Sequence, residues 1–78
     1  MRYDLKYGIS ISDFLRTADL CEGAVLYEGR DGDSLDLKSQ LSKYLFLAAE
    51  RNPEYLFSGK ICCEAPDAVK LSDYIVIP

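Results

Sequence analysis

The residue types that most often carry out acid–base chemistry are scarce in this chain of 78 residues. It contains no histidine, so imidazole cannot serve here as an acid, a base, a metal ligand or a phosphate carrier. A serine hydroxyl is a weak nucleophile at neutral pH unless a base activates it. The composition therefore favours a binding domain rather than an enzyme.

Three cysteines, Cys21, Cys62 and Cys63, are the thiols of the chain. Their number is odd, and their spacing matches neither a CxxC pair nor a zinc-binding pattern. Cys62 and Cys63 are adjacent in an expected strand, where successive side chains point to opposite faces. We expect buried or half-buried free thiols, because unpaired cysteine is most often a core residue.

Acidic side chains cluster in one glycine-rich stretch, where Asp31, Asp33 and Asp36 superficially suggest a calcium-binding loop. The stretch lacks the glycine and the twelfth-position glutamate of an EF-hand loop, and we expect no flanking helices. We interpret it as a solvated turn. The chain also lacks the phosphate-binding GxxxxGKS/T and GxGxxG patterns. We therefore expect no metal and no cofactor.

A strand followed by a helix is predicted at the start of the chain. Residues 2–7 alternate between apolar and charged side chains, as a half-buried strand does. Ser10 or Ser12 can cap the helix, and Asp13 in its first turn meets the positive end of the helix dipole. Gly23 is a typical helix stop.

A hairpin and a second helix come next. Residues 24–28 and 34–38 favour strands, and the five residues between them are rich in glycine and aspartate, which predicts a hairpin. Ser39 is a good N-cap for the helix that follows. This helix carries apolar residues at i, i+3, i+4 and i+7, a stripe that we expect to face the core. The stripe consists of Leu41, Tyr44, Leu45 and Ala48.

The last third of the chain is predicted to complete the sheet. Asn52 and Pro53 end the second helix, because the residue before proline avoids helical geometry. We expect a strand over residues 54–65 and then a short helix with Pro66 in its first turn. Residues 74–77 are rich in β-branched side chains and predict either a last strand or a packed tail.

The predicted order is β-α-β-β-α-β followed by a short helix, in a single domain over residues 1–78. Helices in this order must cover one face of an antiparallel sheet, which gives a two-layer α+β sandwich. The other face of the sheet can stay open to water.

The formal net charge of −4 argues against a nucleic-acid partner, because an acidic domain repels phosphate backbones. The longest apolar runs, residues 44–49 and 74–78, are far shorter than the roughly 20 residues that span a bilayer. The first residues contain no apolar stretch typical of a signal peptide. We therefore expect a cytoplasmic protein without a membrane partner.

The predicted order ends with a short helix, Gly-Ile-Ser-Ile-Ser at residues 8–12 precedes the first helix, and Leu-Lys-Ser at residues 37–39 precedes the second. Together these features resemble the HPr family, the histidine-containing phosphocarriers of the sugar phosphotransferase system. Two short motifs carry the resemblance. Residues 8–12, Gly-Ile-Ser-Ile-Ser, are similar to the family's active-centre motif Gly-Ile-His-Ala-Arg-Pro. Residues 37–39, Leu-Lys-Ser, are similar to the family's Leu-Lys-Ser, whose serine is a regulatory phosphorylation site. The resemblance implies an HPr-like fold.

The matched positions depart from the family at its active centre. Ser10 stands where the family has its phosphorylated histidine, Ser12 where it has arginine, and Asp13 where it has proline. No histidine is present to activate Ser10, and Asp13 places a negative charge where a phosphoryl group would bind. We therefore expect that phosphohistidine carrier activity has been lost.

Ser39 keeps the residue type of the family's regulatory phosphosite. A phosphate there would meet free N–H groups at the helix start, with Lys38 as a nearby cation. The alternative is that Ser39 is only an N-cap. Family partners dock beside this serine, which implies a partner surface of Lys38, Gln40, Leu41 and Tyr44. The apolar stripe instead predicts that Leu41 and Tyr44 lie in the core, and the sequence leaves both alternatives open.

Two functions are compatible with these patterns. The first is a non-catalytic HPr-like domain that binds a protein partner, with Ser39 as a candidate regulatory phosphosite. The second is a structural or oligomerising α+β module, HPr-like or ferredoxin-like, with no tie to sugar transport. The apolar segment from Tyr74 to Ile77 favours a homo-oligomer, because an exposed strand can pair with another chain.

Overall fold

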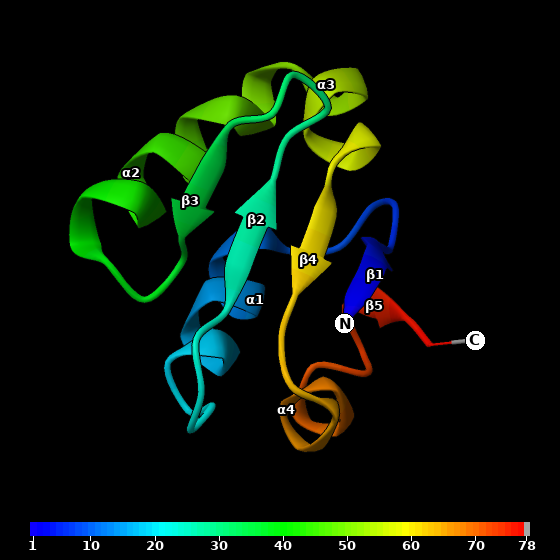
Figure 1. Ribbon diagram of the computed structural model, residues 1–78. Coiled ribbons are helices and arrows are strands. Elements are labelled where there is room, and N and C mark those ends of the chain that lie inside the picture. The colour runs from blue at the N-terminus through cyan, green and yellow to red at the C-terminus, as the bar shows by residue number, and fades with distance from the viewer. Residues whose placement is uncertain (78) are drawn as a thin grey trace.

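Residues 1–77, which the computed structural model describes, form a five-stranded antiparallel sheet and four α-helices (Figure 1). The strands are β1 (Arg2–Leu5), β2 (Leu26–Glu28), β3 (Ser34–Asp36), β4 (Lys60–Cys62) and β5 (Ile75–Val76). The helices are α1 (Ile11–Ala18), α2 (Gln40–Ala48), α3 (Pro53–Ser58) and α4 (Ala65–Lys70), and a 3-10 turn, η1 (Ala49–Arg51), joins α2 to α3. The predicted α+β class is confirmed.

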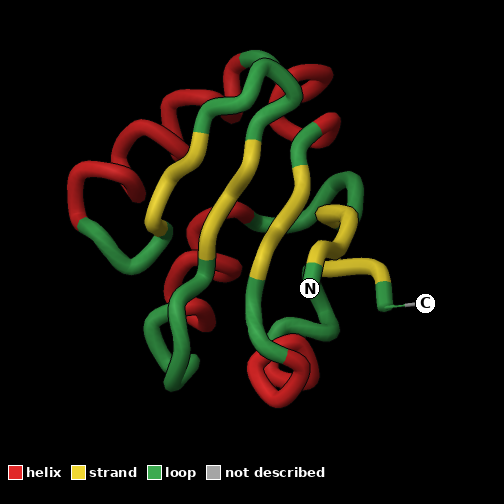
Figure 2. Tube along the Cα trace, viewed as in Figure 1, coloured by secondary structure: helices red, strands yellow, loops and turns green. Residues whose placement is uncertain are grey.

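The strands lie in the order β3-β2-β4-β1-β5. β1 therefore sits between the two strands that come last in the chain, with Tyr3 opposite Ile61 and Leu5 opposite Ile75. In the β2–β4 pair, Tyr27 lies opposite Ile61. Figure 2 shows the strands side by side, with the helices gathered on one side of the sheet and at its ends.

The core lies between the inner face of the sheet and the two longer helices. Phe46 of α2 is fully buried, and its ring centroid is 5.0 Å from that of Tyr27 on β2 and 6.0 Å from that of Phe14 on α1. The three rings therefore join both helices to the sheet. The strands contribute alternate buried residues to this core: Tyr3, Leu5, Tyr27, Ile61 and Ile75.

The outer face of the sheet is mostly polar, with Leu26, Cys62 and Val76 as its apolar residues. Arg2 Nε lies 2.9 Å from Glu28 Oε1, and Lys60 forms an ion pair with Asp4. These four residues alternate along their strands with the buried ones, so their side chains point away from the helices. The face is in contact with water, as expected for an antiparallel sheet.

The predicted strand over residues 54–65 is wrong in its first part, where the chain forms α3. Asn52 caps this helix, because its side-chain oxygen accepts a hydrogen bond from the Tyr55 N–H at 3.4 Å, and Pro53 lies in the first turn. The Asn-Pro pair therefore separates two helices rather than a helix and a strand. Within the predicted stretch, only residues 60–62 pair in the sheet.

The first strand and the first helix are both shorter than predicted. β1 ends at Leu5, and Tyr7 beyond it is exposed. α1 ends at Ala18, and Gly23 is not its stop, since the Gly23 N–H instead donates to the Asp67 carboxylate at 2.9 Å.

The hairpin and the end of the chain agree with the sequence patterns. Residues 29–33 connect β2 to β3, as predicted, although both strands are two residues shorter than the predicted 24–28 and 34–38. Pro66 lies in the first turn of α4. Leu71, directly after the helix, is fully buried. Of the two alternatives for residues 74–77, the strand is present, because β5 pairs with β1. Pro78 lies outside the described residues.

Candidate functional site

The apolar stripe of α2 faces solvent, so the prediction that it lies in the core is wrong. Leu41, Tyr44 and Leu45 are 69%, 71% and 46% exposed, and Ala48 is exposed as well. Within residues 40–48, all of which are described, Phe46 alone is buried. Phe46 lies about 200° around the helix from Tyr44, so the helix that inserts Phe46 between α1 and the sheet must turn the stripe outward.

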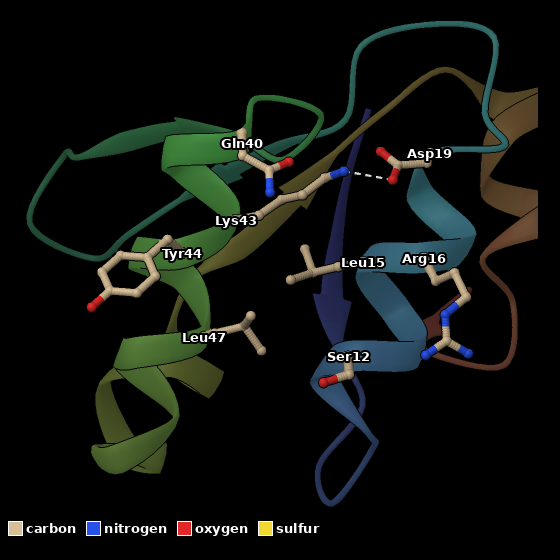
Figure 3. A pocket seen from close by; sticks show the side chains of 8 residues that line it. All are labelled: Ser12, Leu15, Arg16, Asp19, Gln40, Lys43, Tyr44 and Leu47. Carbon is tan, nitrogen blue, oxygen red and sulfur yellow. Dashed lines mark hydrogen bonds and ion pairs between the residues drawn. The ribbon is translucent and has the colours of Figure 1, made fainter.

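A hollow of about 310 Å³ lies between α1 and α2, beside the exposed stripe (Figure 3). Leu15 of α1 and Leu47 of α2 point toward each other across it, and Tyr44 extends from its outer wall. The hollow is thus continuous with the exposed face of α2. Its lining residues are Ser12, Leu15, Arg16, Asp19, Gln40, Lys43, Tyr44 and Leu47.

The charged residues around the hollow are paired with one another. Lys43 Nζ lies 2.5 Å from Asp19 Oδ2, and the Lys43 side chain is only 19% exposed. Arg16 Nη1 lies 3.3 Å from Asp13 Oδ1. The hollow and the stripe therefore offer a largely apolar contact surface with compensated charges at its edge.

The three residues that match the family's active centre lie at the start of α1. Ser10 is the N-cap, and its Oγ accepts a hydrogen bond from the Asp13 N–H at 3.3 Å. The Asp13 carboxylate pairs with Arg16. Ser12 is exposed and lines the hollow. These contacts serve the helix start, and they give the hydroxyl groups of Ser10 and Ser12 no activating base.

Ser39 is the N-cap residue of α2, as predicted, but its hydroxyl makes no capping hydrogen bond within residues 1–77. The ammonium group of Lys38 is not available beside Ser39, because it forms hydrogen bonds elsewhere. Its Nζ donates to the carbonyl oxygens of Cys21 at 2.5 Å and Gly23 at 3.2 Å, in the loop after α1. Of the four predicted partner-surface residues, Gln40, Leu41 and Tyr44 are exposed on α2, and Lys38 instead ties α2 to that loop.

The same loop is held from α4 by Asp67. Its carboxylate accepts hydrogen bonds from the Gly23 N–H at 2.9 Å and the Glu22 N–H at 3.1 Å. These two bonds, the one from Gly23 first, hold the pKa of the Asp67 carboxyl below its usual value. No sequence pattern pointed to this contact, because its partners are more than 40 positions apart in the chain.

The cysteines are free thiols, as predicted, with Cys21 and Cys63 buried and Cys62 half-buried. Burial raises the pKa of both Cys21 and Cys63. Residues 1–77 contain no group of three or more side chains placed to hold a metal ion. The same residues form no helix that is long and apolar enough to cross a membrane.

Comparisons of the chain with protein-family models, with curated proteins and with solved structures found no match. The structural features that point to a function are the exposed stripe of α2 and the adjoining hollow.

Proposed function

We propose that the chain is a non-catalytic HPr-like domain that binds a protein partner through the exposed stripe of α2 and the hollow beside it. The carrying observation is that Leu41, Tyr44 and Leu45 stay exposed while the core closes without them. Contiguous apolar patches with a polar rim mark interaction sites on soluble proteins. Leu41 and Tyr44, which are 69% and 71% exposed, bury little of their surface in the isolated fold, so binding is the best explanation of the stripe.

The order of elements supports the HPr-like part of the proposal. A strand, a helix, a hairpin, a helix, a strand and a helix follow one another, with α3 and β5 as additions. The Gly-Ile-Ser-Ile-Ser motif comes directly before and into α1, and Leu-Lys-Ser comes directly before α2. Both motifs thus stand at the helix starts that the resemblance assigns to them.

The environment of Ser10 supports the loss of carrier activity. Its Oγ caps α1, and the neighbouring Asp13 already supplies an anion at the helix start. Incubation with enzyme I and labelled phosphoenolpyruvate should leave the chain unlabelled while an authentic HPr becomes labelled. Label on Ser10 would contradict the proposal.

Phosphorylation of Ser39 by an HPr serine kinase is the regulatory part of the proposal. Ser39 begins the helix that carries the binding stripe, so a phosphate there would add charge at its edge. Intact mass after incubation with ATP and the kinase should show one added phosphate, and Ser39→Ala should abolish it. An unchanged mass, or addition that persists in Ser39→Ala, would contradict this part.

The binding surface has a matched pair of variants. Leu41 on α2 and Val69 on α4 are both helical aliphatic residues, 69% and 71% exposed. Leu41→Glu should weaken binding to the HPr serine kinase at least about tenfold, because a charge would be buried in the interface. Val69→Glu should bind like the parent chain. Equal affinity of all three proteins would contradict the assigned surface.

The second candidate function, an oligomerising module, is favoured by one observation at the sheet edge. β5 is the outermost strand on its side, and Val76 and Ile77 are each 47% exposed. Ile75 is part of the core, so deleting the segment would damage the fold. Val76→Lys with Ile77→Lys tests the edge instead, and a dimer that these changes dissociate would favour this candidate.

A further inference from the structure

We propose that the exposed stripe of α2 is a two-fold interface in which α2 of a second copy of this chain packs antiparallel against it. The inference rests on the binding surface of the proposed function and names an occupant for it. Because both use the same stripe, a partner protein must displace the second copy. The most common symmetric assembly of soluble proteins is a two-fold dimer of this isologous kind.

The spacing of the stripe suits an antiparallel pair of helices. Leu41, Tyr44, Leu45 and Ala48 recur at i, i+3, i+4 and i+7, the pattern by which one helix packs on another. A two-fold axis midway between residues 44 and 45 places Leu41 opposite Ala48 of the second copy, and Tyr44 opposite its Leu45. Each large side chain then faces a smaller one, and every contact occurs twice.

The charges on α2 favour a second copy of the same stripe as the partner over a charged helix from another protein. Lys43 is the single charged residue of α2, and Asp19 of the same chain neutralises it at 2.5 Å. Two copies of the stripe therefore meet without unpaired like charges. A strongly acidic or basic helix from another protein would find no opposite charge on the stripe, and burying its charges unpaired would be costly.

The size of the surface predicts a weak dimer. An interface of standard size takes about 800 Å² from each partner, roughly a sixth of the 4763 Å² that this chain exposes. α2 is only about 14 Å long, so we expect its stripe and the adjoining hollow to bury less than that area. We expect a dissociation constant on the order of 100 µM.

Sedimentation velocity of the full chain, from about 10 µM to about 1 mM, tests the dimer. The mass should rise with concentration from 8.8 kDa toward twice that value. Leu41→Glu and Leu45→Glu should remain monomeric at every concentration. Their unfolding midpoints in urea should stay close to that of the monomeric parent chain. Val69→Glu, the matched control, and Val76→Glu on the sheet edge should dimerise like the parent chain. A monomer at every concentration, or a dimer lost in Val76→Glu but retained in Leu41→Glu, would overturn the proposal.

The antiparallel arrangement has its own measurement. In a mixture of differently isotope-labelled chains, intermolecular NOEs should connect the Leu41 methyl groups of one copy to the Ala48 methyl group of the other. NOEs between Leu41 and Leu41 would overturn the arrangement. A chain that dimerises through α2 but does not bind the kinase refutes only the proposed function. A chain that binds the kinase but stays monomeric refutes only this inference.

Discussion

The two longer helices, α1 and α2, differ in how their apolar residues face the rest of the molecule. α1 buries half of its eight residues, and Ser10 caps it with a hydrogen bond. α2 has a larger share of apolar residues but buries Phe46 alone, and its N-cap makes no side-chain bond within the described part of the chain. The residues that α1 buries are Ile11, Phe14, Leu15 and Ala18.

The difference separates two uses of the same pattern. In α1 the apolar face is the attachment to the sheet. In α2 one deep side chain attaches the helix, and the apolar stripe is left for contacts outside the monomer. Stability and recognition therefore depend on different residues of α2, and they can be changed separately.

The largest expected effect comes from removing the anchors of the two helices. Phe14→Ala and Phe46→Ala should each lower the free energy of unfolding by about 3–5 kcal/mol, because both rings are fully buried. Urea titrations followed by circular dichroism measure the loss. Phe46→Leu, which removes less of the buried side chain and should cost less than Phe46→Ala, keeps the test usable if Phe46→Ala does not fold. A much smaller loss for Phe46→Ala than for Phe14→Ala would mean that α2 has another anchor.

The next effect concerns the loop after α1, which Asp67 and Lys38 hold. Because hydrogen bonds lower the pKa of Asp67 from its ordinary 3.8 in the folded state, the unfolded chain binds this proton more readily. The stabilisation is therefore complete above the ordinary pKa and is lost as the pH falls through the folded value. Urea midpoints should fall more steeply below about pH 4 for the parent chain than for Asp67→Asn.

Asp73→Asn, which alters an exposed carboxylate after α4, is the control and should follow the parent profile. If Asp67→Asn has the same pH profile as the parent chain, the carboxylate does not hold this loop, and the contrast with α2 weakens.

The smallest expected effect distinguishes the two helix caps. Ser10→Ala should cost about 1 kcal/mol, because it removes a capping bond to the Asp13 N–H. Ser39→Ala should cost only a few tenths of a kcal/mol, since the Ser39 hydroxyl makes no such bond. Thermal unfolding of the two variants side by side measures the difference. Equal costs would show that both helices depend on their caps alike.

The sequence predicted the order of most elements but not which way α2 faces. Alternation in β1, the glycine-rich turn before β3 and the proline of α4 are local signals, and each predicted the kind of element correctly though not always its length. The period of α2 identified a stripe, yet Phe46 on the other side is equally apolar. Its burial depends on rings from α1 and β2, which are distant in the chain.

The error at α3 and the missed contact of Asp67 have different causes. Asn52 and Pro53 are a stop signal for one helix and a start signal for the next, and the prediction used only the first of these two local signals. The hydrogen bond from the Gly23 N–H to Asp67 depends instead on tertiary placement. Local patterns carry no information on such distant contacts.

The place of β1 between β4 and β5 also governs how the chain can assemble during synthesis. β1 pairs with β4 and β5. Arg2 therefore cannot form its sheet pair until its partner Cys62 has been synthesised. At about 5–20 residues per second, a ribosome needs roughly 3–12 s to add the 60 residues from Tyr3 to Cys62. Tyr3 and Leu5 lack their strand partners throughout that interval. Closing so long a loop costs entropy, so β1 joins the sheet only after β4 has been made, and this pairing is a late step of folding.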